Sequence, residues 1–331
     1  MAGGLIASAI SPHTPRIGIE ANAPPFLKGV IEGSHALGEA IRAFNPDLLI
    51  VNSTHWVTTF PWYATCHDVH RGHCVADEAP DLIPGLPYER PGDPEFGNAL
   101  IDAMGAAGIL SGRNTSPHYH WDYGSYVPLH YLDPTSRIPA VTVGTCLMAS
   151  LEECTKVGAL IRATAERLGR RAIFIASTAL AHRIERGPEK WPPPEHQEAD
   201  RGFITSLCTG RIAEAKSALP TYAKEVVAEM GGRPLAVFLG GLDARRQYTG
   251  KQYGAYGQSS GSGNANHLAG ELFNQVARVQ LVNVPYKGGG PAIIDLLGGQ
   301  VQLMFSVPTS VIQHVKSGRL KAYAYTGDKP L

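Results

Sequence analysis

Three short runs of apolar residues constrain the fold of this chain more than any other feature. They read DLLIVNS (47–53), IPAVTVGTC (138–146) and RAIFIAST (171–178). Each run is short and almost continuously apolar, which is typical of strands buried on both faces of a parallel sheet. We therefore predict an α/β protein in which helices cover both faces of a largely parallel sheet.

Helical patterns between these runs support that prediction. A first strand is expected at 5–10, and apolar spacing predicts helices at 26–44, 95–107, 151–168 and 200–229, the last with a break at Pro220. The run PLAVFLGGL (234–242) could be a helix or a strand. The first strand, helix and second strand form a βαβ unit, so we expect those two strands to be parallel neighbours. The sum is a doubly wound domain over residues 1–266.

The pattern restarts at residue 267 and continues to residue 331. Helices are expected at 268–277, 291–297 and 309–317, alternating with strands at 279–286, 301–307 and 320–326. A segment of this length is too short to bury an adequate core by itself. We therefore predict a short α/β tail, foreign to the first domain.

Composition excludes several classes of function. Lys+Arg and Asp+Glu both number 29, which argues against a nucleic-acid partner. No apolar run is long enough to span a membrane, and the first residues resemble a strand more than a signal peptide. Five cysteines without a CxxC motif fit a reducing, cytoplasmic setting. The stretch CHDVHRGHC (66–74) could bind a metal ion, but we expect an exposed loop there.

Histidines follow three of the predicted strands. His13 and His55 come directly after the first and second strands, and His182 follows the run RAIFIAST. The carboxyl ends of parallel strands share one edge of a sheet, where ligands bind in open α/β folds. A single histidine in a loop is most often a surface residue, but three at strand ends favour a metal or catalytic site.

An aromatic loop at 116–132 is the candidate substrate contact. It contains His118, His120, Asp122 and Tyr123, and Trp56 lies next to His55. Imidazole and aromatic groups together suit a flat, hydroxylated ring. The alternative is a loop that packs on the sheet edge, with Asp122 and Tyr123 bonded to the backbone.

Four motifs occur in a characteristic order: SPHTP, STHW, WDYGSYVPL and ASTALAHR. They resemble the class III extradiol ring-cleavage dioxygenases of the LigB type, especially the homoprotocatechuate and 2-aminophenol branches. The resemblance implies a mononuclear Fe(II) held by His13, His55 and a carboxylate. It also implies an acid/base role for His182 and places Tyr123 behind the metal ligands. Such an enzyme inserts O2 into a substituted catechol, trihydroxyarene or 2-aminophenol, and we expect a homo-oligomer.

The third metal ligand is the point at which the sequence departs from this family. The resemblance places the carboxylate at Gln252, in KQYGAYG, where an amide brings no negative charge. Three alternatives follow: Gln252 completes a weakened site, the carboxylate comes from elsewhere, or activity is impaired. The rival hypotheses are a zinc hydrolase on the same site and a non-catalytic remnant of recombination.

The tail resembles a different family. NHLAGELF, VPYKGGGPAIIDLLGGQVQLMF and VKSGRLKAYA are similar to motifs of the tripartite tricarboxylate (Bug-type) solute-binding proteins. Only part of that family's length is represented, so we expect no binding cleft. The sequence SSGSGNAN (259–266) is interpreted as the join of a gene fusion.

Overall fold

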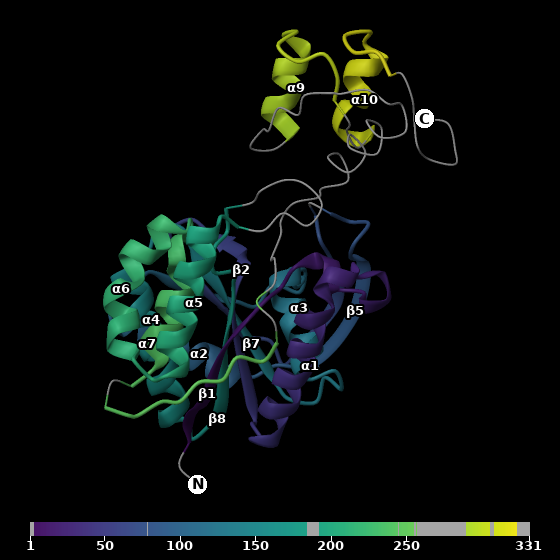
Figure 1. Cartoon of the computed structure of the whole chain (residues 1–331). Helices are drawn as coiled ribbons and strands as arrows, with labels where there is room; N and C mark the ends of the chain where they lie inside the picture. Colours follow the sequence, from purple (N-terminus) through teal and green to yellow (C-terminus); the bar gives the residue numbers. More distant parts are fainter. Residues whose placement is uncertain are drawn as a thin grey trace. The chain divides into compact units, whose positions relative to one another are not determined.

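The computed structural model describes residues 3–77, 79–183, 192–243, 245–254, 256, 289–304 and 308–322 (Figure 1). Its contacts divide the chain into two compact units, Met1–Gly261 and Ser262–Leu331. Each unit is described by itself.

The first unit is built on a six-stranded sheet of order β1-β8-β2-β7-β3-β6. All its pairs are parallel except β3 with β7, and β4 and β5 form a separate antiparallel ribbon. The strands are β1 (Gly4–Ser11), β2 (Leu48–Thr58), β3 (Trp62–Thr65), β4 (Val69–Val75), β5 (Pro84–Pro91), β6 (Ser111–Asn114), β7 (Ala140–Cys146) and β8 (Arg171–Ser177).

Helices cover both faces of this sheet (Figure 1). The α-helices of the unit are α1 (Lys28–Ala43), α2 (Pro94–Ala106), α3 (Tyr123–Leu132), α4 (Leu151–Arg167), α5 (Pro194–Cys208), α6 (Ile212–Glu225) and α7 (Arg233–Gly241). Short 3-10 turns are η1 (Pro15–Ile17), η2 (Glu20–Asn22), η3 (Pro25–Leu27) and η4 (Glu229–Gly232). Helices α2, α4 and α7 pack on one face and α1 and α3 on the other; α6 packs against α7, and α5 packs against α6.

The apolar runs form strands because they supply side chains to two cores at once. Successive side chains of a strand point to opposite faces. In β2, Leu48 and Ile50 belong to the core under α4 and α7, whereas Leu49 and Val51 belong to the core under α1 and α3. The prediction of a largely parallel sheet flanked by helices is confirmed.

Four details of the predicted fold are wrong. β8 lies between β1 and β2, so the first two strands are not neighbours. The expected helix at 200–229 is two helices, α5 and α6, separated at Gly210, whose φ of 74° ends the first. Pro220 lies inside α6 and does not break it. The stretch CHDVHRGHC, expected to be a loop, supplies β4.

The run PLAVFLGGL, left open between helix and strand, lies in the buried helix α7. In the second unit, α9 (Gly289–Leu297) and α10 (Pro308–Lys316) match two of the three helices expected there. Residues 301–304 are not in a strand, and 268–286 and 305–307 lie outside the described residues. Within the described part of the chain, no helix has the length and apolar character needed to cross a bilayer.

Candidate metal centre

A row of serines marks the carboxyl edge of the sheet. Ser11 of β1 pairs with Ser177 of β8, which pairs with Ser53 of β2. β8 ends at this level, whereas the chain continues past both neighbouring serines to His13 and His55, each two residues further on. The two imidazoles therefore meet beyond the end of the strand that separates β1 from β2.

The two histidines and one carboxylate form a compact cluster. The Nε2 atoms of His13 and His55 are 3.2 Å apart. The Oε1 atom of Glu229 lies 3.3 Å from Nε2 of His13 and 3.6 Å from Nε2 of His55. Glu229 and His13 are buried, and His55 is half-buried. Among the described residues, these three form the one group of His, Cys, Asp or Glu side chains arranged to hold a metal ion.

The hydrogen bonds behind His13 orient its ring. The Ser177 hydroxyl donates to the Gly124 carbonyl at 2.5 Å, so its oxygen accepts from Nδ1–H of His13 at 3.1 Å. With the proton on Nδ1, the Nε2 lone pair points into the cluster. Neutral imidazole oriented in this way by a second group is the usual metal-binding form of histidine.

Glu229 is presented by a strained turn. Val227 and Met230 on either side have φ values of 51° and 52°, a region that bulky residues rarely adopt. The second carboxylate oxygen, Oε2, accepts hydrogen bonds from the Ala179 backbone N–H at 2.6 Å and from the Thr178 hydroxyl at 3.3 Å. Strain of this kind persists where surrounding contacts hold it, and it concentrates at functional sites.

Electrostatics favour an ionised carboxylate beside the imidazoles. Burial raises the pKa of Glu229, but the nearby His13 and His182 and the Ala179 N–H outweigh burial and lower it below its usual value. Nε2 of His182 lies 3.6 Å from Oε1 of Glu229. Burial lowers the pKa of His182, against the opposite effect of Glu229. His182 thus borders the cluster, outside the group of three that could hold an ion.

The start of α3 lies behind the two imidazoles. Asp122 caps the helix, accepting from Ser125 N–H at 3.0 Å and from the Ser53 hydroxyl at 2.5 Å. This docks Tyr123 against both histidines, with ring centroids 4.0 Å from His55 and 5.9 Å from His13. Asp122 thus caps a helix, as the packing alternative has it, and its role as a substrate contact stays a prediction.

The cluster fits a transition-metal ion. Neighbouring ligands bound at about 2.1 Å are separated by roughly 3.0 Å in octahedral and 3.4 Å in tetrahedral geometry. The three separations in the cluster, 3.2, 3.3 and 3.6 Å, lie close to these values. Two imidazoles and one carboxylate on one side of an ion leave further positions open to other ligands.

The prediction that Gln252 completes this cluster is not supported. Gln252 is exposed, and its amide nitrogen donates to the Gly254 carbonyl at 2.9 Å. The carboxylate that lies beside His13 and His55 is that of Glu229, which was expected at the end of a long helix. The signal available was a glutamate between VVA and GGRP, since Gly231 and Gly232, with φ of 63° and 77°, permit the turn.

The predicted substrate contacts lie in different places. His118 and His120 are exposed, and His120 lies over Gly72 of β4. Trp56 packs with Tyr119, at a ring-centroid separation of 4.7 Å. The roles of His118, His120 and Trp56 stay predictions.

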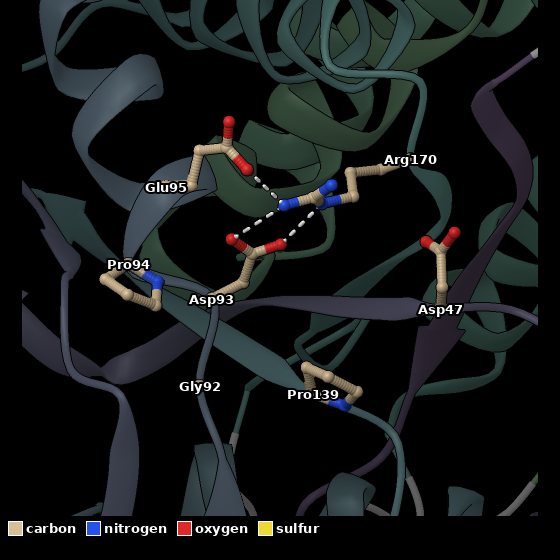
Figure 2. A pocket seen from close by; sticks show the side chains of 7 residues that line it. All are labelled: Asp47, Gly92, Asp93, Pro94, Glu95, Pro139 and Arg170. Carbon is tan, nitrogen blue, oxygen red and sulfur yellow. Dashed lines mark hydrogen bonds and ion pairs between the residues drawn. The ribbon is translucent and has the colours of Figure 1, made fainter.

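A cavity at the opposite, amino edge of the sheet has a different character (Figure 2). Its lining residues precede β2, β7 and β8 or begin α2. They are Asp47, Gly92, Asp93, Pro94, Glu95, Pro139 and Arg170. Arg170 bridges Asp93 at 2.7 Å and Glu95 at 2.6 Å. Arg170 is thus held by two carboxylates, and Asp47 accepts a hydrogen bond from the Arg171 backbone N–H at 2.8 Å.

Two families match the chain. Residues 7–265 match the family described as the catalytic LigB subunit of aromatic ring-opening dioxygenase. Residues 244–330 match the tripartite tricarboxylate transporter family receptor. The two matches overlap over 244–265, and both predicted resemblances are confirmed.

Curated relatives agree with this division. The chain is 28% identical to the 2-aminophenol 1,6-dioxygenase beta subunit of Pseudomonas sp., over 80% of this chain and 93% of the relative. It is 26% identical to 3,4-dihydroxyphenylacetate 2,3-dioxygenase of Escherichia coli, over 70% and 88%. The tail is 42% identical to protein BugT of Bordetella pertussis over 62 residues, 19% of each chain.

A solved structure shares the fold. An uncharacterized protein of Escherichia coli K12 aligns with a TM-score of 0.50 and 17% identity, over 68% of this chain and 89% of that one. At this identity the likeness concerns the fold alone.

Proposed function

The chain belongs to the family of the catalytic LigB subunit of aromatic ring-opening dioxygenases, and on that premise we propose that it is an Fe(II)-dependent extradiol dioxygenase. The observation that carries the proposal is the convergence of His13, His55 and Glu229 within 3.6 Å of one another. The proposed substrate is a substituted catechol, a trihydroxyarene or a 2-aminophenol.

The donor set supports ferrous iron as the metal. Two imidazoles and one carboxylate, with positions left open, are the ligands of non-haem Fe(II) oxygenases. His13, His55 and Glu229 would hold the ion. When bound, iron would supply a path for electrons between the aromatic ring and O2.

The protein's own groups would orient the substrate and exchange its protons. His182 offers Nε2 beside the cluster, where it would accept a proton from the substrate's hydroxyl and return it later. Tyr123 would hold the His13 and His55 rings in place by packing against them. The names of the two dioxygenase relatives specify rings with a hydroxyl next to a second hydroxyl or an amino group, which supports the same substrate class here.

The main argument for an impaired remnant was the missing carboxylate at position 252. Glu229 would answer that argument, because it would supply the negative charge from another part of the chain; the foreign tail is the other argument for a remnant. A zinc hydrolase would use the same three ligands, so the choice between oxidative and hydrolytic chemistry needs an experiment.

The test is anaerobic reconstitution of the full chain with Fe(II), followed by oxygen and a panel of catechols, trihydroxybenzenes and 2-aminophenols. We expect one O2 consumed per ring and a coloured, semialdehyde-type product. Hydrolysis of esters or amides that depends on zinc would overturn the proposal. Binding of phenols without oxygen uptake in the iron-loaded protein would also overturn it.

A further inference from the structure

A two-residue ladder connects the segments that carry His182 and Glu229. Ala181 forms an antiparallel bridge with Ala228, and the His182 backbone N–H donates to the Val227 carbonyl at 3.2 Å. His182 and Glu229 each lie next to a residue of this bridge. Any displacement of the ladder therefore moves both functional side chains.

A buried carboxylate on α5 holds the ladder in place. Asp200 is 1% exposed, and its Oδ2 atom accepts from the Ala181 backbone N–H at 3.2 Å. The same oxygen accepts from the Tyr256 hydroxyl at 2.6 Å, whereas Oδ1 accepts from the Tyr222 hydroxyl at 2.6 Å. No Lys, Arg or His within the described ranges forms an ion pair with Asp200. Burying a carboxylate without a cation is unfavourable unless donors satisfy it, so all three hydrogen bonds stabilise its charge. Only the two made by Oδ2 join Tyr256 to the ladder.

Tyr256 reaches Asp200 from the region where the two family matches overlap. Residues 245–254 cross two helices on the way. The Gly250 N–H donates to the Cys208 carbonyl at the end of α5, and the Tyr253 carbonyl lies so close to Gly33 of α1 that a side chain would not fit there. Tyr256 precedes the boundary between the two units, which falls after Gly261. The segment shared by both families thus contacts the residue that holds the ladder.

We propose that Asp200 and Tyr256 are positioning residues, which fix His182 and Glu229 through the Ala181–Ala228 bridge and thereby set the rate of ring cleavage. The inference rests on the proposed function for its catalytic consequence. Its structural part, the restraint of Ala181 by Asp200, does not depend on the reaction. Of the two carboxylate oxygens of Asp200, only Oδ2 accepts hydrogen bonds from both the Tyr256 hydroxyl and the Ala181 N–H of the ladder.

The test compares Tyr256→Phe with Tyr222→Phe in the full chain. Each substitution removes one hydroxyl group that donates to the Asp200 carboxylate. Tyr256→Phe removes the donor to Oδ2, and Tyr222→Phe removes the donor to Oδ1. For Tyr256→Phe we expect amide hydrogen exchange in the peptide spanning residues 178–183 to become about tenfold faster, the effect of one lost hydrogen bond to a charged group. We also expect kcat to fall about tenfold with KM within about twofold. Tyr222→Phe should leave all three quantities within about twofold.

Asp200 provides a second comparison. Asp200→Asn keeps an oxygen acceptor for the Ala181 N–H and should retain about tenfold more activity than Asp200→Ala. Equal effects of Tyr256→Phe and Tyr222→Phe on hydrogen exchange would overturn the positioning role. If the iron-loaded, unmodified chain cleaved no ring, the proposed function would fail while the exchange measurement still decided the positioning role.

Discussion

The two edges of the sheet use the same residue types for opposite purposes. His13 at the carboxyl edge and His70 at the amino edge are 4% and 5% exposed. Nε2 of His13 faces Glu229 and His55, whereas Nε2 of His70 donates to the Ala140 carbonyl at 2.9 Å, where β7 begins. One imidazole faces two side chains that could share a metal ion with it, and the other satisfies a backbone carbonyl.

The carboxylates differ in the same way. At the amino edge, Asp93 caps α2 and pairs with Arg170, so its charge is neutralised by an arginine. At the carboxyl edge, Glu229 faces imidazoles on a strained turn. The amino edge pairs its charged groups, whereas the carboxyl edge holds a strained turn beside three side chains that could bind a metal ion. Substitutions at the two edges should therefore affect different measurements.

The largest effect is expected at Glu229. Glu229→Gln removes the negative charge from the cluster, so we expect Fe(II) affinity to fall by more than about 100-fold and ring cleavage by about 1000-fold. Metal titration and oxygen uptake measure these changes. The matched control is Gln252→Glu, which adds a carboxylate at an exposed site and should change neither value by more than about twofold. A gain of iron affinity in Gln252→Glu would restore the original assignment of the third ligand.

The next effect separates proton transfer from metal binding. His182→Gln should lower kcat by about 100-fold or more, the usual contribution of a positioned acid/base group, and leave Fe(II) affinity within about threefold. Stopped-flow kinetics and metal titration check the two parts. A loss of iron equal to that of Glu229→Gln would make His182 a ligand and contradict the role proposed for it.

At the amino edge, the contribution of His70 to the free energy of unfolding should depend on pH. Burial lowers the pKa of His70 to about 4; the hydrogen bond to the Ala140 carbonyl opposes this shift, and the neighbouring His67 and Arg90 add to it. In the unfolded chain a histidine takes up a proton below about pH 6.5. Neutral, buried His70 therefore stabilises the folded protein fully above pH 6.5. This contribution to the free energy of unfolding, up to about 3 kcal/mol, is lost as the pH falls toward 4.

Urea unfolding of the original chain and His70→Gln at several pH values measures this contribution. The difference between the two free energies of unfolding should shrink steadily from pH 7 to pH 4.5. A constant difference over that range would show that the pKa of His70 is the same in the folded and the unfolded protein.

Arg170 tests the amino edge as a stabilising element. Arg170→Gln leaves Asp93 buried without its cation, so we expect a loss of about 2 kcal/mol in the free energy of unfolding. Ring cleavage should stay within about twofold. Arg71→Gln is the control, because the ion pair of Arg71 with Glu89 is exposed to solvent and should contribute little to the free energy of unfolding. A large loss of kcat in Arg170→Gln would remove the distinction between the two edges.

The smallest effect tests the strain at the carboxyl edge. Val227 is 52% exposed with a φ of 51°, and asparagine tolerates that conformation better than valine does. Val227→Asn should raise the free energy of unfolding by about 1 kcal/mol and lower Fe(II) affinity by a few fold. Val69→Asn, at an exposed valine in β4, should be destabilising instead. Destabilisation by both substitutions would mean that the turn stores no strain.

Local pattern predicted much of the fold and part of the site. The apolar runs predicted β2, β7 and β8, and the positions of His13 and His55 just beyond strand ends predicted that they would meet. Strand order could not be predicted, because β8 can lie between β1 and β2 without changing any local pattern. His13 and His55 meet despite the wrong strand order, because both lie beyond the end of β8.

Glu229 shows the limit of local pattern more sharply. Apolar residues at helical spacing predicted a helix through the turn at Val227 and Met230. No sequence pattern indicates that this turn contacts the segment after β8. The bridge between Ala181 and Ala228 is a tertiary contact, so the carboxylate could be located only once the chain was folded.

The most direct test is an anomalous-scattering map of crystals of the full chain, loaded with Fe(II) without oxygen and measured at the iron absorption edge. We predict one peak, about 2.1 Å from Nε2 of His13, Nε2 of His55 and a carboxylate oxygen of Glu229. A peak bound by the Gln252 amide, or no peak at this cluster, would contradict the account.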